Sequence, residues 1–99
     1  MSQPESLEDI MRGVLSRMGL PAPSISVSLE RDWPEVAGEP WAGRTRPLFI
    51  RDNELVVEAV APALVAMLRY AVGDLLRRLD QHLGEGVVES VRVVGPGRS

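Results

Sequence analysis

The sequence predicts an α+β fold, in which a three-stranded sheet has helices packed on one face, and three observations lead to this prediction. A β-branched run, residues 54–60, leads directly into the longest amphipathic pattern of the chain, residues 62–83. Two shorter apolar stripes come before it, and a valine-rich run, residues 87–94, comes after it. The expected order is therefore helix, helix, strand, strand, helix, strand.

The first two elements are expected to be helices. Ser6 suits an N-cap with Asp9 three residues on, and Gly19 suits the end of this helix. Between them runs an apolar stripe made of Leu7, Ile10, Met11, Val14, Leu15 and Met18. A second helix is expected from Ser24 to about Val36, with Gly38 ending the element. Its apolar side is formed by Ile25, Val27 or Ser28, Leu29, Trp33, Val36 and Ala37. Because a proline inside a helix removes a backbone bond, Pro34 should kink this element or divide it in two.

A loop and two strands follow. We interpret residues 39–47 as a single short turn of helix and then a loop, and residues 48–51 as the first strand. Asp52 and Asn53 form a two-residue hairpin turn, so that Glu54 opens the second strand. In residues 54–60 a charge falls on only one of the two alternating faces, which is typical of a strand with one face largely buried.

The amphipathic pattern at 62–83 predicts one long helix. Pro62 suits its first turn and Gly84 its left-handed end. The apolar positions recur every three or four residues, at Leu64, Leu68, Ala71, Val72, Leu75, Leu76, Leu79 and Leu83. About twenty helical residues span roughly 30 Å, so this helix is expected to cross the whole domain. Residues 87–94 are the third expected strand and 95–99 a flexible tail, giving one domain with its core at about 7–94.

Composition limits the classes of function. The 99 residues suit a single domain, and the sequence contains no cysteine and no apolar run long enough to span a bilayer. Its N-terminus is acidic and polar, unlike a signal peptide, so we expect a cytoplasmic protein with no membrane partner. The net charge of −3 argues against a strong nonspecific nucleic-acid binder. Residues 40–78 nevertheless hold six arginines against four carboxylates, which leaves room for a local positive patch.

The sequence offers no constellation that suggests chemistry. His82 is the only histidine, and without cysteines or a second histidine it is a poor metal ligand. No spacing of serine, histidine and aspartate suggests a triad, and no glycine loop suggests a phosphate site. We therefore expect a protein that is not an enzyme, with no catalytic residue, metal, cofactor or small-molecule substrate.

Five runs of residues carry a resemblance to a known family. They are Trp33–Gly38, Arg44–Leu48, Leu55–Glu58, Pro62 with Ala63, and Met67–Arg69. Over about residues 20–92 the chain resembles the DciA family of bacterial replicative-helicase loaders, long catalogued as a domain of unknown function. The resemblance implies a KH-like domain that takes part in loading the replicative helicase onto DNA, with contacts to the helicase and to single-stranded or branched DNA. Members commonly carry a long flexible extension and many are basic, whereas this chain is almost all domain and is acidic.

Nucleic-acid contact, if present, would have to use an unusual surface for a KH-like domain. The GxxG loop by which KH domains clamp nucleic acid is absent, since the only close glycine pairs are Gly84 with Gly86 and Gly95 with Gly97. The candidate nucleic-acid-binding residues are instead arginines, namely Arg44, Arg46, Arg51, Arg69 and Arg77.

Each candidate has an alternative interpretation. Arg44 and Arg46 would point the same way if extended and suit neighbouring phosphates, or they pair with the acidic N-terminal helices. Arg77 suits a phosphate, or it pairs with Asp80, as Arg78 would with Asp74. Arg69 has no acidic residue three or four positions away on its helix, so it is the better candidate for a functional contact.

The two tryptophans lead to different expectations. Trp33, on an apolar stripe, is expected to anchor the core. Trp41 lies in an irregular segment, where it is either buried or exposed for base stacking or for partner contact, and it is our candidate partner-binding residue.

These patterns lead to two hypotheses for the function. The first is a noncatalytic adaptor in DNA replication, resembling a helicase loader, whose partners are the replicative DNA helicase and, more weakly, single-stranded or branched DNA. The second is a KH-like protein interaction module without nucleic-acid binding.

Overall fold

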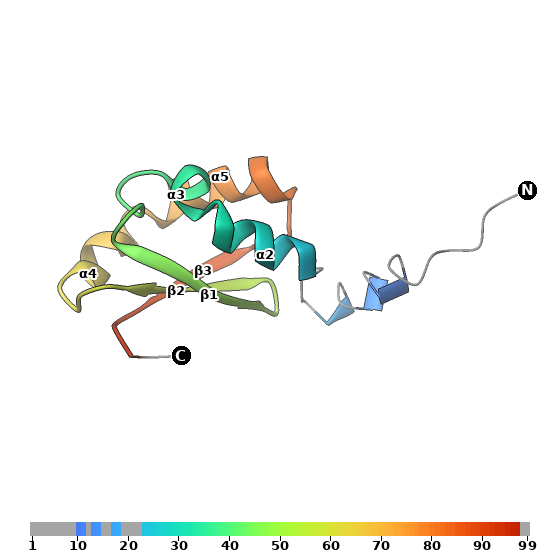
Figure 1. Cartoon of the computed structure of the whole chain (residues 1–99), viewed down its shortest axis with the longest axis horizontal. Helices are drawn as coiled ribbons and strands as arrows, with labels where there is room; N and C mark the ends of the chain where they lie inside the picture. The colour runs from blue at the N-terminus through green and yellow to red at the C-terminus, as the bar shows by residue number, and fades with distance from the viewer. Residues whose placement is uncertain (1–9, 12, 15–16, 19–22, 98–99) are drawn as a thin grey trace, which may run out of the picture.

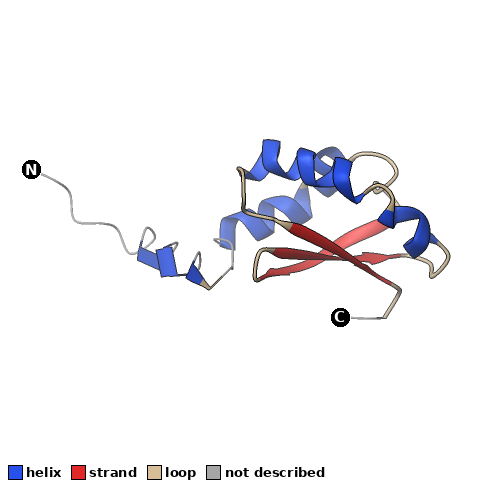
Figure 2. Ribbon diagram, turned by 180° about the vertical axis from the view of Figure 1, so that it is seen from behind, coloured by secondary structure: helices blue, strands red, loops and turns tan. Residues whose placement is uncertain are grey.

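The α+β prediction is confirmed by a computed structural model, which describes residues 10–11, 13–14, 17–18 and 23–97. Helices α2, α3 and α5 lie over one face of the sheet, and α4 lies at one end of it (Figures 1 and 2). In order, the elements are α2 (Pro23–Arg31), α3 (Trp33–Ala37), β1 (Thr45–Arg51), β2 (Glu54–Ala59), α4 (Leu64–Arg69), α5 (Val72–Leu83) and β3 (Ser90–Val94).

The first expected helix lies largely outside the described residues, Ser6 and Gly19 included. Residues 10, 11, 13, 14 and 17 are helical. Of its stripe, Ile10, Met11, Val14 and Met18 are exposed. The described core therefore begins at α2.

The sheet is mixed, in the order β1, β2, β3. Strands β1 and β2 pair in antiparallel fashion through the predicted two-residue turn, in which Asp52 and Asn53 have φ angles of 52° and 60°. Two successive positive φ values match the right-handed twist of a hairpin, and aspartate and asparagine tolerate them. Strand β3 lies parallel to β2, which requires the crossover formed by α4 and α5.

Pro34 divides the second expected helix, as its position predicts. α2 ends at Arg31 and α3 begins at Trp33, with Pro34 in the first turn of α3. Gly38 ends α3 with a φ of 64°. Of the two alternatives for the inner side of α2, Ser28 is half-buried and Val27 is 63% exposed, so Ser28 faces inward.

The first strand begins earlier than predicted. Residues 39–44 form hydrogen-bonded turns and no helix, and β1 starts at Thr45 where the sequence suggested Leu48. The register shifts between Pro47 and Phe49, which leaves Leu48 as the extra residue of a bulge. Proline is tolerated at a bulge in an edge strand, so Pro47 does not end the strand as expected.

The prediction of one long helix at 62–83 is wrong, because the chain turns between α4 and α5. The N–H groups of Tyr70 and Ala71 bond the carbonyls of Met67 and Leu68, three residues back, at 3.2 and 2.9 Å. These bonds tighten the last turn of α4, and the aromatic, β-branched and glycine residues that follow are weak helix formers. Gly84 ends α5 with a φ of 103°, as predicted.

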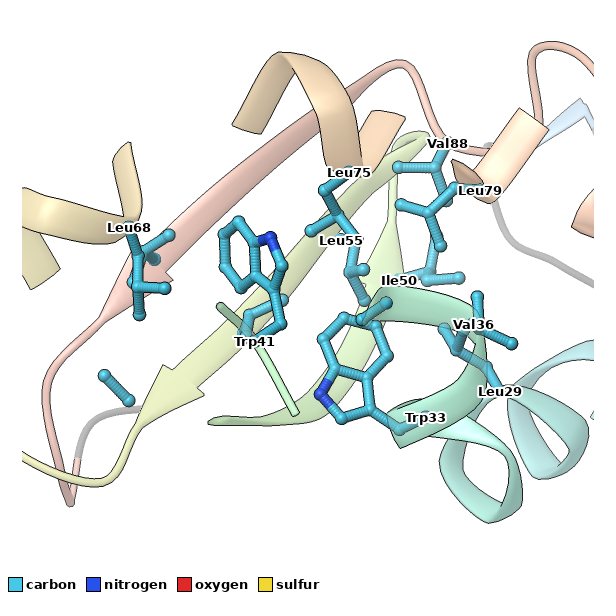
Figure 3. Close-up of a cluster of buried hydrophobic side chains, with 14 residues drawn as sticks. Leu29, Trp33, Val36, Trp41, Ile50, Leu55, Leu68, Leu75, Leu79 and Val88 are labelled. Atoms are coloured by element: carbon cyan, nitrogen blue, oxygen red, sulfur yellow. The ribbon is translucent and has the colours of Figure 1, made fainter. Parts of the chain in front are cut away.

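The core lies between the helices and the sheet (Figure 3). Trp33 is 3% exposed, which confirms it as a core anchor. Trp41 is only 1% exposed. This burial contradicts the exposed alternative, on which its assignment as a partner-binding residue was based. In the view of Figure 3, Trp41 lies between Leu68 of α4 and Leu75 of α5, and all three side chains belong to one buried cluster.

Two expectations for the strands need correction. Burial of one face was expected for β2. Instead, both faces carry buried residues, since Leu55, Val56 and Val57 are all buried. Val56 lies on the face without helices, between Phe49 of β1 and Arg92 of β3 in the register, and these long side chains flank it. β3 begins at Ser90, later than predicted.

The described part of the tail, residues 95–97, is not free, because Gly97 N–H donates to Glu58 Oε2 at 2.9 Å. Residues 98–99 lie outside the described residues.

Candidate functional site

The five candidate arginines do not gather at one place. Arg44 and Arg46 stand at the start of β1, whereas Arg51 stands at its far end beside the hairpin. Arg69 is the last residue of α4, and Arg77 lies on the exposed side of α5. These five arginines are therefore separate cations and form no continuous basic track among themselves.

Three of the five are paired with carboxylates. Arg44 contacts Glu39 at 3.3 Å, and Arg46 contacts Glu58 at 2.7 Å. Arg77 contacts Asp74 at 3.0 Å. The pairing alternative thus holds for these arginines, although the partners differ from those expected.

Of the three partners, only that of Arg46 comes from another secondary-structure element. Arg46 pairs across the sheet with β2, and not with the N-terminal helices. Arg77 pairs with Asp74, which also binds Arg78 at 3.1 Å as predicted, and not with Asp80.

The sheet face that carries no helix is charged but compensated. We call it the open face, and by the strand register its side chains are Arg46, Phe49, Arg51, Glu54, Val56, Glu58, Ser90, Arg92 and Val94. Glu54 accepts a bond from Arg92 at 3.0 Å, as Glu58 does from Arg46. The Arg46 hydrogen bond and that from the Gly97 N–H hold the pKa of Glu58 below its ordinary value. Each glutamate of β2 thus neutralises an arginine, and the open face is not a strongly positive surface.

Arg51 and Arg69 are the candidates with no side-chain partner within the described ranges. Arg69 borders a groove of about 420 Å³ between α4 and the end of β3. The groove is lined by Pro62, Val65, Arg69, Val93, Val94, Gly95 and Pro96. Arg69 is the one charged side chain of this lining, and the rest is formed by backbone as well as by valine and proline side chains.

Tyr70, which was not among the candidates, is the most exposed large hydrophobic side chain in the described part of the chain. Tyr70 is 94% exposed at the corner between α4 and α5, next to Arg69 and one helical turn from the exposed Met67. Tyrosine and arginine are enriched at interface hot spots. The sequence does carry a signal for this residue, because Tyr70 is an aromatic residue that does not belong to the apolar stripe of residues 64–83.

Among the described residues, no three histidine, cysteine, aspartate or glutamate side chains come together in a group that could hold a metal ion. In the same part of the chain, no helix is both long and apolar enough to cross a membrane.

Comparison with known families identifies the chain. The family model described as "Dna[CI] antecedent, DciA" matches residues 6–93. The chain belongs to the DciA family. The match covers every element of the fold except the last residue of β3.

Curated relatives of this DciA-family chain come from actinobacteria and carry the name UPF0232 protein. One from Rhodococcus jostii is 36% identical over 64 residues, which cover 65% of this chain and 34% of that protein. One from Mycolicibacterium paratuberculosis is 29% identical over 93 residues, covering 94% of this chain and 51% of the relative. A third, from Streptomyces avermitilis, is 29% identical over 96 residues, covering 95% and 53%. The chain spans about half the length of the curated relatives it matches, or less.

Proposed function

We propose that this DciA-family domain is a noncatalytic adaptor in bacterial DNA replication that contacts the replicative helicase. The observation that carries the proposal is the family match over residues 6–93. Resemblance to this family is what implies a role in loading the replicative helicase. The fold adds an exposed corner between α4 and α5 that a partner could contact.

A protein contact is favoured over a nucleic-acid contact by the charges. Arg44, Arg46 and Arg77 each have a carboxylate within 4 Å, so binding phosphate would require breaking an ion pair. The α4–α5 corner instead exposes Tyr70 beside Arg69, a combination that suits a protein interface.

A second candidate function, interaction without nucleic acid, is favoured by the same ion pairs. In that case the adaptor binds only protein partners. Under the first hypothesis, by contrast, DNA would be left with Arg51 and Arg69, the two candidates that are unpaired in the described part of the chain.

The test is binding of the purified domain to the replicative helicase of its own source, with and without single-stranded DNA. We expect the parent domain to bind and Tyr70→Ala to weaken binding by about tenfold or more, the loss typical of a hot-spot residue. Val27→Ala is the matched control, because Val27 is also exposed but lies on α2. No binding by a folded domain would contradict the helicase contact. Equal loss for both variants would remove the α4–α5 corner as its site.

A further inference from the structure

The two outer edges of the sheet differ. The β1 edge contains Pro47, which has no N–H, and a bulge at the next residue. Both features are typical of edges that do not accept another strand. β3 has neither, and its register with β2 runs unbroken from Ser90 to Val94. The outward N–H and C=O groups of β3 therefore form a regular template for an added strand.

The β3 edge is bordered by the groove described above. On one side of the groove are Val93 and Val94, and on the other are Val65 and Arg69 of α4. Figure 1 shows α4 at the end of the sheet where β3 finishes. A strand added to β3 would place every second side chain toward one face, so alternate side chains would meet the valines and Arg69 of this groove.

We propose that the β3 edge and this groove bind an extended peptide segment of a partner protein. The segment pairs with β3 as a fourth strand, sets an apolar side chain against Val65 and Val93, and presents a carboxylate to Arg69. Backbone pairing requires a regular row of amide and carbonyl groups along the chain, which a peptide backbone has and a sugar-phosphate backbone lacks. The single arginine of the groove matches one carboxylate better than it matches a row of phosphates.

This inference deepens the proposed adaptor function, because it names the class of segment that the partner supplies. The peptide site does not depend on which protein the partner is. Its test therefore uses peptides, whereas the test of the adaptor function uses the helicase.

The experiment selects binders to the purified domain from a displayed library of random short peptides. The best peptide is then synthesised with single N-methyl groups along its backbone, and binding is measured by fluorescence anisotropy. Methylation of alternate amides should weaken binding by about tenfold or more, because each blocks a bond to β3, whereas methylation between them should have little effect. Amide hydrogen exchange of residues 90–94 should slow in the complex.

The charge contact is tested on the protein. Arg69→Glu should weaken binding by about fivefold, and a peptide whose acidic residue is changed to arginine should recover it. Arg77→Glu is the control, since Arg77 is an exposed helical arginine away from the groove.

Three outcomes would overturn the proposal. The first is that N-methylation of the selected peptides shows no alternation along the backbone, or that amide hydrogen exchange of residues 90–94 does not slow in the complex. Another is oligothymidine, and no peptide, binding with the same dependence on Arg69. The last is pairing of β3 with a second copy, detected as a dimer by analytical ultracentrifugation. A domain that binds the peptide but not the helicase would refute only the adaptor function, and the reverse result would refute only the peptide site.

Discussion

At the scale of single residues, the two tryptophans are linked by one hydroxyl. Trp33 Nε1 donates to Thr45 Oγ1 at 3.0 Å, and that hydroxyl donates to the Trp41 carbonyl at 2.8 Å. The contact joins α3 to the start of β1. Burial of Trp33 follows from its helical spacing. Burial of Trp41 does not, because the cluster that it joins is made largely of residues distant in sequence, such as Leu68 and Leu75.

The hydroxyl of Thr45 should matter more than its size suggests. Thr45→Val keeps the shape but leaves Trp33 Nε1 and the Trp41 carbonyl without this partner, in a buried site. We expect a loss of about 1–3 kcal/mol in the free energy of unfolding, measured by urea denaturation with tryptophan fluorescence. Thr45→Ser keeps the hydroxyl and serves as control. A valine variant as stable as the parent would show that the relay contributes nothing.

The Glu58 carboxylate should make stability depend on pH. Its pKa is held below the ordinary value of 4.5 by the Arg46 hydrogen bond first and then by the Gly97 N–H. A lowered folded-state pKa stabilises the protein above the ordinary value, and this stabilisation is lost as the pH falls through the lowered pKa.

Comparison of the parent with Glu58→Gln measures this effect. Thermal unfolding should show the parent to be more stable at neutral pH, with the difference shrinking in acid below the ordinary glutamate range. A difference that is the same at neutral and acidic pH would contradict the role of the charge.

At the scale of elements, the sequence predicts most of the fold but not the division of its helices. The hairpin, the break at Pro34 and the ends at Gly38 and Gly84 follow from local chemistry. The turn between α4 and α5 does not, because one tight turn changes the direction of the chain yet keeps the apolar spacing. A single stripe therefore predicts one helix where there are two. The candidate site was predicted less well, since three of its arginines pair with carboxylates, and the partner of Arg46 lies on another strand.

Gly38 and Gly84 provide a matched pair of helix ends. Both combine a positive φ with an extended ψ, a conformation that is open essentially only to glycine, so alanine should cost about 1–3 kcal/mol at either. A Cβ at Gly38 would also meet the Arg78 guanidinium, which donates to the Ala37 carbonyl at 3.2 Å. Gly38→Ala should therefore be the more destabilising, by about 1 kcal/mol, as measured by thermal melts.

A double-mutant cycle separates the two causes. In an Arg78→Ala background the two glycine substitutions should cost the same, because only the backbone effect remains. If Gly38→Ala stays the worse variant there, the guanidinium is not the reason.

At the scale of the whole molecule, paired charges set the expected response to DNA. Single-stranded DNA binding weakens with salt in proportion to the phosphates neutralised. Arg51 and Arg69 lie at opposite ends of the sheet, so a short DNA strand contacts only one of them at a time. We expect a slope of about −0.7 for log affinity against log salt, where five contacts would give about −3.5.

Two double variants test the assignment. Arg51→Ala with Arg69→Ala should reduce oligothymidine affinity and slope, whereas Arg44→Ala with Arg46→Ala should change neither appreciably, because these two arginines already bind carboxylates. A larger effect of the second pair would show that the ion pairs open for DNA.

The unequal edges of the sheet also limit self-assembly. Two molecules that pair through β3 would form one continuous six-stranded sheet, whose outer edges are then both β1. Each outer edge carries Pro47 and the bulge, which do not accept a further strand. Edge-to-edge growth therefore stops at a closed pair, and this fold has a built-in barrier against fibre formation by its native sheet.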